Sequence, residues 1–202
     1  MALLAGLTGG MGSGKSLAAK FLQELGAHLI DADAVCRTLL EPKKPAWTEA
    51  VDLFGQQAIK VDGTLDREKI AEIIFSDPDK KKALENILHP RVFAEERRIF
   101  QNIRECEKDA LVIVNAPLLI ESGNYKKMDK VVVISCDEEV QVRRVIAKGV
   151  FTAEDARKRI KSQMGLKEKL RFADYILENN TTVEAFKIRV ANLYRDLKNL
   201  AS

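Results

Sequence analysis

The residues with the clearest chemical meaning lie in one loop near the N-terminus. The segment Gly9–Ser16, GGMGSGKS, matches the pattern G-x-x-x-x-G-K-[ST] and stands between a short apolar run and an apolar repeat of helical spacing. Glycines let successive N–H groups turn inwards around a phosphate, and a helix N-terminus adds partial positive charge. In such a loop Lys15 reaches the β- and γ-phosphates and the Ser16 hydroxyl binds Mg²⁺. The loop therefore predicts a nucleoside triphosphate site that includes Gly10, Gly12, Ser13 and Gly14.

The competing dinucleotide-binding pattern does not fit this loop. Counted from Gly10 and Gly12, the last glycine of G-x-G-x-x-G would fall on Lys15. No N-K-x-D motif of a GTP switch protein occurs, and the β-branched run LVIVN ends on Asn115 where a large ATPase would usually carry an acid. These observations favour a small-molecule kinase among the proteins with such a loop.

Two carboxylates follow the second short apolar run. Ligands of a parallel sheet gather at the carboxyl ends of its strands, so we expect Asp33 in the same crevice as the loop, near the γ-phosphate. There a carboxylate can orient and partly deprotonate an attacking hydroxyl. The alternative for Asp33 is an N-cap of the following helix. For Asp31 we expect that cap role or a role in a turn.

A basic helical stretch covers residues 143–161. It contains Arg143, Arg144, Lys148, Arg157, Lys158, Arg159 and Lys161. Most of these side chains are expected on a solvated helix face. One or two guanidinium groups on a closing lid would neutralise charge on a transferred phosphoryl group and exclude water from it. The residues alone do not identify the acceptor of that group.

The helices and strands expected to position these residues indicate an α/β fold. Short apolar runs at 2–8, 28–30, 111–114, 131–135 and 175–177 predict strands, and helical spacing lies between them. Such alternation is typical of a parallel sheet, here of about five strands, with helices on both faces in three layers. We expect one chain with a core of 1–32, 109–138 and 170–202, a helical substrate-binding insertion at 33–108 and a lid at 139–169.

Composition sets the broad class of the protein. The chain has 202 residues, 46% of them hydrophobic, and a net charge of +3. Its three scattered cysteines fit no zinc or redox spacing, and neither a secretory signal nor a run of about 20 apolar residues is seen. We expect a cytoplasmic protein without membrane partners. A nucleic-acid-binding ATPase would need a basic stripe with aromatics, and only 6% of residues are aromatic.

The chain resembles the dephospho-CoA kinase family over nearly its whole length, in the loop and in several later segments. The segments that carry this resemblance are, in order, LTGGMGSGKS, LIDADAVCR, ENILHPRV, APLLIE, RIKSQ and ADYILENN. The resemblance implies a P-loop kinase that transfers the γ-phosphoryl group of ATP to the ribose 3′-hydroxyl of dephospho-CoA, giving CoA and ADP. This is the last step of coenzyme A biosynthesis. It also implies a nucleotide-binding core, a helical CoA-binding insertion and a lid, with no signal for the oligomeric state.

The resemblance also implies roles for individual residues. The phosphates of ATP would be wrapped by Gly12 to Leu17, and the acceptor hydroxyl would meet Asp33. The remaining acceptor-side residues would be Arg37, His89, Arg91, Leu118, Leu119 and Glu121. Arg144 and Arg159 would be the lid arginines, Arg144 acting in catalysis with Lys15, and Asn179 would border the adenine. The alternatives are that the adenine contact is made by the backbone, with the Asn179 side chain structural, and that Pro117 to Leu119 only form the wall of the site. His89 can equally be a structural histidine before Pro90.

Several positions depart from the family pattern. Leu17 stands where threonine is usual, Gly165 where proline is common, and Thr181 where glycine often follows the asparagines. The segment AKGVF is a shortened form of A-R-D-G-L in which Lys148 replaces an arginine. These changes bear on lid geometry and adenine contacts. The alternatives are another small-molecule kinase, such as a nucleoside monophosphate kinase, and a regulatory protein that binds ATP without transferring phosphate.

Overall fold

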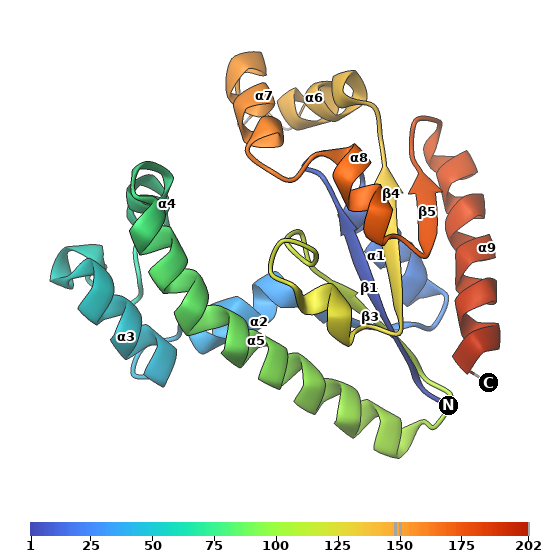
Figure 1. Ribbon diagram of the computed structural model, residues 1–202, viewed down its shortest axis with the longest axis horizontal. Helices are drawn as coiled ribbons and strands as arrows, with labels where there is room; N and C mark the ends of the chain where they lie inside the picture. Colours follow the sequence, from blue (N-terminus) through green and yellow to red (C-terminus); the bar gives the residue numbers. More distant parts are fainter. Residues whose placement is uncertain (148, 150, 202) are drawn as a thin grey trace. The chain divides into compact units, whose positions relative to one another are not determined.

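The computed structural model describes residues 1–147, 149 and 151–201, and it forms two compact units (Figure 1). The first, here called the sheet unit, contains Met1–Ile30 and Phe100–Ser202. The second, the helical unit, contains Asp31–Ile99. Lys148, one of the departures from the family pattern, lies outside the described residues.

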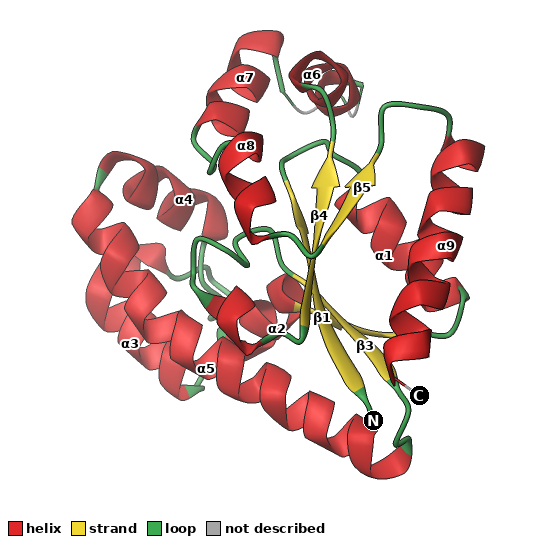
Figure 2. Cartoon of the chain, turned by 45° about the vertical axis from the view of Figure 1, so that its right-hand side comes forward, coloured by secondary structure: helices red, strands yellow, loops and turns green. Residues whose placement is uncertain are grey.

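The described residues of the sheet unit are organised around a five-stranded sheet of order β2-β3-β1-β4-β5. Figure 2 shows four of these strands, β1, β3, β4 and β5. The strands are β1 Leu3–Gly9, β2 His28–Asp31, β3 Leu111–Asn115, β4 Lys130–Ser135 and β5 Tyr175–Glu178. β1 runs parallel to both β3 and β4, and β4 runs parallel to β5. All residues of β1 and β3 are buried, as expected for central strands covered on both faces. The predicted α/β fold is confirmed.

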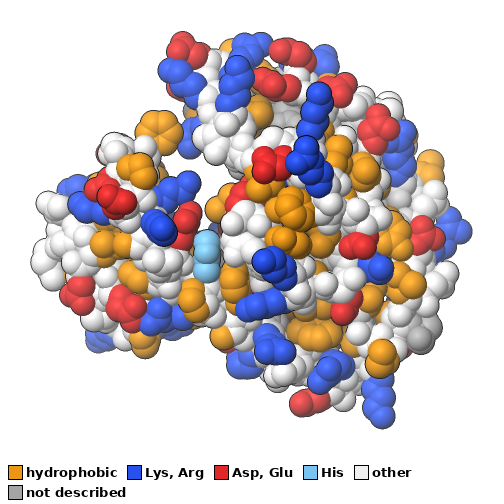
Figure 3. Space-filling view, in the orientation of Figure 1, with side chains coloured by type: hydrophobic (Ala, Val, Ile, Leu, Met, Phe, Trp, Pro, Cys, Tyr) orange, Lys and Arg blue, Asp and Glu red, His pale blue; other side chains and the backbone are white. Residues whose placement is uncertain are grey.

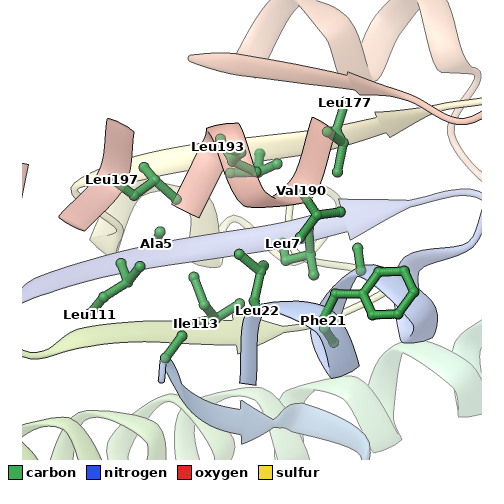
Figure 4. Packing of buried hydrophobic residues seen from close by; sticks show 14 of the residues in the cluster. Ala5, Leu7, Phe21, Leu22, Leu111, Ile113, Leu177, Val190, Leu193 and Leu197 are labelled. Carbon is green, nitrogen blue, oxygen red and sulfur yellow. The ribbon is translucent and has the colours of Figure 1, made fainter. Parts of the chain in front are cut away.

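Helices α1 (Lys15–Glu24) and α9 (Val183–Ala201) cover one face of this sheet. Side chains alternate along a strand, so Ala5 and Leu7 of β1 point to this face. They meet Leu22 of α1 together with Val190 and Leu197 of α9 (Figure 4). The main core of the unit therefore lies between the sheet and the two helices α1 and α9.

The opposite face is covered by the segment after β3 and by α8. That segment contains the short 3-10 helix η2 (Asn124–Lys127), and α8 (Leu166–Lys169) continues into η3 (Leu170–Phe172). Tyr125 and Phe172 meet edge to face with ring centroids 4.8 Å apart. Gly6 is required here, because a Cβ at that position would lie 2.4 Å from Leu119 Cδ2.

Two further helices follow β4. They are α6 (Glu138–Ile146) and α7 (Ala153–Lys161). They share a small apolar cluster of Val142, Val145 and Ala156, against which Phe151 and Ile160 pack. With α8 they make up the region predicted from the sequence as a lid, which we call the predicted lid (139–169).

The helical unit has its own apolar core. Its elements are α2 (Ala32–Leu39), α3 (Pro45–Phe54), the 3-10 helix η1 (Gln56–Ala58), α4 (Arg67–Ser76) and the first part of α5 (Pro78–Cys106). Ala50, Phe54 and Ile70 belong to its buried cluster. As expected from the sequence, its described residues contain no strand, although one isolated bridge joins Ile59 and Leu65.

Among the described residues, no helix combines the length and apolar character needed to cross a membrane. On the face shown in Figure 3, basic and acidic side chains are intermixed, with hydrophobic groups scattered among them. Single exposed hydrophobic side chains of this kind are normal for a solvated protein surface.

A charged cluster joins the C-terminal end of α9 to the turn before β3. Lys198 Nζ donates to Asp109 Oδ2 (3.1 Å) and to Glu107 Oε1 (3.5 Å), and His28 Nε2 lies 2.8 Å from Glu107 Oε2. The hydrogen bond with His28 lowers the pKa of Glu107, and the hydrogen bond from Lys198 lowers the pKa of Asp109. The cluster lies at the surface, so its contribution is moderate and screened by salt.

These pKa shifts predict a pH-dependent stability. A carboxyl group whose pKa is lowered by folding stabilises the native state above its unfolded pKa and loses this effect as the pH falls through its folded pKa. Lys198→Met should therefore lower the Tm slightly at pH 7 in low salt, and the difference from the unaltered protein should shrink below about pH 4. Thermal denaturation followed by circular dichroism at both pH values tests this. A Tm difference that is unchanged in acid would contradict it.

Candidate active site

The loop between β1 and α1 has the backbone geometry of an anion site. Gly12 and Gly14 have φ angles of 76° and 99°, and Gly14 is the N-cap residue of α1. Ser13 N donates to Gly10 O (3.1 Å) and closes the loop into a turn. The first N–H groups of an α-helix have no intrahelical partner, so at α1 they point out of the N-terminus beside this turn. A phosphate placed there would accept them at the positive end of the helix dipole.

Neither of these glycines has room for a side chain. A Cβ at Gly12 would lie 2.6 Å from Gln141 O, and one at Gly14 would lie 2.1 Å from Asn179 Nδ2. Both distances are far below a van der Waals contact. The loop is thus packed from outside by α6 and by the segment after β5, and its glycines are needed for this packing as well as for the positive φ angles.

Lys15 is held at the carboxyl edge of the sheet by an amide. Its Nζ donates to Asn115 Oδ1 at 2.8 Å, and Asn115 is the buried last residue of β3, the neighbour of β1. In the sequence, Asn115 stands at the end of a β-branched run, where a large ATPase would usually carry an acidic residue. In the structure Asn115 orients the ammonium group of Lys15. A neutral amide oxygen orients the ammonium group without cancelling its charge. The Lys15 side chain is thus oriented beside the phosphate loop, and Ser16 next to it is exposed.

Asn179, only 2% exposed, supports the loop from the other side. Its Nδ2 donates to Ser13 O (2.7 Å), and its backbone N donates to Ser135 O at the end of β4 (2.8 Å). Arg144 Nη1 donates to Asn179 O (3.0 Å), and Arg144 Nη2 donates to Asn179 Oδ1 (3.4 Å). The side chain of Asn179 is therefore committed to the loop and to Arg144.

The two arginines predicted for the lid have different surroundings. Arg144 is half-buried, and its Nη1 lies 3.5 Å from Cys136 Sγ, a thiol whose pKa is raised by burial. Arg159 is exposed on α7, with Cζ 4.5 Å from the centroid of the Phe151 ring. Arg144 is thus a fixed part of the loop's surroundings, whereas Arg159 sits on the outer helix of the predicted lid.

The predicted lid also touches the loop directly. Met11 N donates to Gln163 Oε1 at 3.0 Å. Gln141 Nε2 donates to Cys136 O (2.8 Å), whereas Gln141 Oε1 and Ser13 Oγ, both buried, have no hydrogen-bond partner among the described residues. Buried polar atoms normally find a partner, so these two mark places for water or for part of a ligand.

The turn after β3 brings further polar groups to the same edge of the sheet. Glu121 Oε1 lies 2.8 Å from Lys169 Nζ, and that ammonium group also donates to Pro117 O (3.2 Å). Leu118 is 39% exposed, whereas Leu119 is fully buried against Gly6. Leu119 therefore belongs to the core of the unit, and of these two leucines only Leu118 offers its side chain to a ligand.

A cavity of about 570 Å³ lies within the sheet unit between the loop and the predicted lid. Its lining includes Gly10, Asp137, Gln141, Gln163 and Lys169. The cavity thus joins the phosphate loop to the unpartnered Gln141 oxygen and to the buried Lys169.

Two aspartates, Asp31 and Asp33, lie at the start of the helical unit. Asp31 ends β2 and caps α2, because its Oδ1 accepts from Ala34 N at 3.0 Å, which confirms the predicted role. Asp33 follows in the first turn of α2 and is exposed. In the sheet β3 lies between β1 and β2, so one strand separates the carboxyl ends of the first two strands.

A second pocket, of about 310 Å³, lies inside the helical unit. It is lined by Asp33, Cys36, Arg37, Leu40, Leu65, Arg67, Ile70, Ala71, Ile74 and Leu84. Burial, and then the negative charge of Asp33, raise the pKa of the Cys36 thiol. The pocket therefore combines apolar walls with one carboxylate and two guanidinium groups. Arg67 was missed in the sequence because it stands alone, outside any motif.

His89 and Arg91 lie on either side of Pro90 within α5. The His89 ring stacks on Phe93 with centroids 5.7 Å apart. Arg91 Nη1 donates to Ile87 O (2.6 Å), and Nη2 donates to Glu49 Oε1 of α3 (2.5 Å). A proline inside a helix removes one backbone hydrogen bond, and Arg91 adds one within the same turn. Both side chains thus have contacts within the helical unit.

Comparison with known proteins gives one consistent family. The family model described as CoaE, dephospho-CoA kinase, matches residues 3–185. A dephospho-CoA kinase of Aquifex aeolicus is 38% identical over 95% of this chain and 96% of its own length, and one of Corynebacterium glutamicum is 40% identical with the same coverage. The solved dephospho-CoA kinase from Campylobacter jejuni superposes with a TM-score of 0.75 at 26% identity and covers 100% of both chains.

The packing of the loop predicts unequal effects of two glycine substitutions. Gly12→Ala places a Cβ 2.6 Å from Gln141 O at a φ of 76°, whereas a Cβ at Gly165 meets nothing within 4 Å. Gly12→Ala should destabilise the protein by about 1–2 kcal/mol from the left-handed backbone alone and should weaken ATP binding. Gly165→Ala is the matched control and should leave both unchanged. Denaturant unfolding and titration with ATP measure the two effects, and equal behaviour of the two variants would contradict the expectation.

The contact between Lys15 and Asn115 predicts a second effect. Asn115→Leu keeps the size of the side chain and removes the amide oxygen that orients Nζ. It should lower kcat/KM for ATP by about tenfold, since a hydrogen bond to a charged group contributes about 1.5–3 kcal/mol. Steady-state kinetics with varied ATP measure this. Unchanged kinetics would mean that Lys15 finds its position without Asn115.

Proposed function

The chain belongs to the dephospho-CoA kinase family, and on that premise we propose that it transfers the γ-phosphoryl group of ATP to the ribose 3′-hydroxyl of dephospho-CoA. The products are CoA and ADP. The single observation that carries the proposal is the phosphate loop, whose lysine is held by Asn115 at the carboxyl edge of the sheet (2.8 Å) in a chain matched to this family over residues 3–185. The remaining residues supply the acceptor side and the closure of the site.

On the ATP side, the N–H groups of the loop and the Lys15 ammonium bind the phosphates. These groups are fixed before ATP arrives, because Asn115, Asn179 and the backbone of α6 hold the loop from three directions. Donors that are already in place need no reorganisation as charge moves towards the leaving oxygen. Arg144, anchored on Asn179, is suited to lie along the bound nucleotide, and Arg159 can approach from the predicted lid.

Magnesium would enter with the nucleotide. Among the described residues, no group of three or more His, Cys, Asp or Glu side chains could hold a metal ion without other ligands. This fits Mg²⁺, which keeps several waters and is commonly bound by substrate phosphates with few protein ligands. The exposed Ser16 hydroxyl at the start of α1 is the protein group that would bind it. The ion would neutralise charge on the β- and γ-phosphates.

On the acceptor side, we assign the general base to Asp33. An exposed carboxylate at the start of α2 can accept a hydrogen bond from the 3′-hydroxyl, orient it in line with the γ-phosphate and take its proton as the new P–O bond forms. The bond from the γ-phosphorus to the bridging oxygen breaks, and ADP leaves with that electron pair.

The pocket of the helical unit supports dephospho-CoA as the acceptor. Its apolar side chains, among them Leu40, Leu65 and Ile74, suit an aliphatic arm, and Arg37 and Arg67 at the same pocket suit phosphate groups. Dephospho-CoA carries both features, whereas a nucleoside monophosphate has no such arm. His89, Arg91, Leu118 and Glu121 remain proposed acceptor contacts.

The compartment proposed for this reaction is the cytoplasm. Cys36, Cys106 and Cys136 are all free thiols in the structure. Unpaired cysteines suit a reducing compartment.

Acceptor profiling tests the proposed reaction. Purified protein is incubated with Mg-ATP and dephospho-CoA, AMP, CMP or UMP, and the added phosphate is followed by mass spectrometry. CoA should be the only phosphorylated product. Asp33→Asn should lower its rate by about a hundredfold or more while ATP affinity is retained, since a positioned base contributes 10²–10⁴-fold. Asp52→Asn, an exposed aspartate of α3, is the control and should be fully active.

The other outcomes decide between the alternatives. Phosphorylated nucleoside monophosphates without CoA would identify a nucleoside monophosphate kinase. ATP binding without any phosphorylated acceptor would identify a nucleotide-binding protein that lacks the transfer reaction. Full activity of Asp33→Asn would remove the general base from Asp33 while leaving the reaction itself in place.

A further inference from the structure

Lys169 is a buried charged group that the mechanism above does not use. Only 1% of its side chain is exposed, and it ranks among the largest fully buried side chains of the described residues. Its Nζ lies 2.8 Å from Glu121 Oε1 and 3.2 Å from Pro117 O. The Glu121 side chain is itself 22% exposed, so the carboxylate is shielded on one side and open on the other.

A buried ion pair of this kind contributes little net stability to the folded protein. The loss of hydration costs as much as the attraction returns, and apolar residues of similar size often serve equally well. The better-attested use of a buried pair is to fix one arrangement among several. At this position the arrangement being fixed is the turn 117–121 at the carboxyl end of β3.

Three contacts converge on that turn. Thr8, near the end of β1, donates from Oγ1 to Pro117 O at 3.2 Å, which is the same oxygen that accepts from Lys169. Leu119 packs on Gly6 of β1. The turn is therefore tied to the strand that leads into the phosphate loop, and Lys169 connects both its first residue and Glu121.

Lys169 also stands where the predicted lid returns to the core. It is the last residue of α8, and the segment before it reaches the loop through Gln163 and Met11 (3.0 Å). Lys169 and Gln163 line the same cavity of about 570 Å³ as Gly10. A shift of Lys169 would thus move the turn, the return of the lid and the wall of the cavity together.

We infer that Lys169 is a positioning residue for phosphoryl transfer, which holds the Glu121 carboxylate and the turn 117–121 in register with the phosphate loop. The inference rests on the proposed function, because that function supplies the reaction whose rate is measured. It does not require Lys169 to touch ATP or the acceptor. Its action goes through Glu121, so the two residues should behave as one unit in kinetics.

A double-mutant cycle tests this unit. Lys169→Met, Glu121→Gln and the double variant are assayed with Mg-ATP and dephospho-CoA beside the unaltered protein, with the Tm of each recorded. Each single variant should lower kcat by about a hundredfold, the effect expected of a small misplacement near the reacting groups, while KM for ATP changes by less than about threefold. The double variant should be no slower than the slower single variant.

A structural role alone would give a different pattern. Lys169→Met leaves Glu121 without its partner, so its Tm should fall, whereas the double variant leaves no unpaired charge and should regain most of that loss. If activity followed stability, the double variant would be active, and the inference would be overturned. A fully active Lys169→Met or effects on kcat that multiply in the double variant would also overturn it. Lys169→Arg, which keeps the charge, should retain most of the activity.

The controls separate this inference from the proposed function. Lys20 forms an exposed ion pair with Glu24 on α1 (3.8 Å), and Lys20→Met should leave kcat and Tm unchanged. If the unaltered protein makes no CoA, the proposed function fails, and the inference fails with it because no phosphoryl transfer is left for Lys169 to support. If the unaltered protein makes CoA and the cycle is additive, only the role of Lys169 fails. Should Lys169→Met not fold, the comparison of the double variant with Glu121→Gln decides the question.

Discussion

The phosphate loop has to present its N–H groups to an anion in a fixed arrangement, although it is built from the most flexible residues. The structure meets this constraint by packing the loop from outside. Gln141 O of α6 lies against Gly12, Asn179 Nδ2 lies against Gly14 and binds Ser13 O (2.7 Å), and Asn115 holds Lys15. The conformation of the loop is thus fixed by the residues that pack against it. The glycines only allow the backbone angles that this conformation needs. The rigid sheet beneath the loop is what keeps those neighbours in place.

The same strategy recurs along the carboxyl edge of the sheet. Asn115 ends β3, Asn179 follows β5, and Thr8 lies just before the end of β1. Each of these buried polar side chains forms a hydrogen bond with another segment of the chain. Buried polar groups of this type are costly when unpartnered, so a network of them permits few alternative arrangements. The polar side chains at this edge of the sheet therefore have a fixed arrangement before any substrate binds.

Much of the fold was readable from the sequence because its signals are local. Short apolar runs, two of them rich in β-branched residues, predicted the strands, and the helical spacing between them predicted α1 and α9. The loop was recognised because its chemistry is contained in one segment, Gly9–Ser16. Asp31 was assigned as a cap for the same reason, since its partner Ala34 is three residues away.

The contacts that complete the site were not readable in this way. Lys15 and Asn115 are 100 residues apart, Met11 and Gln163 are 152 apart, and Lys169 and Pro117 are 52 apart. Nothing in a single sequence pairs such residues, because the pairing is created by the order of strands in the sheet. Leu119 illustrates the reverse error. It stands beside the exposed Leu118 in the sequence, but in the structure its side chain is fully buried against Gly6.

The small cluster shared by α6 and α7 has a consequence for local unfolding. Val142, Val145 and Ala156 are its buried members, and most other residues of α7 are exposed. So little apolar burial gives α7 a low free energy of opening compared with β1, which is buried along its whole length. Amide hydrogens of α7 should then exchange with solvent long before those of the central sheet. α7 should therefore open and close many times while the central sheet stays folded.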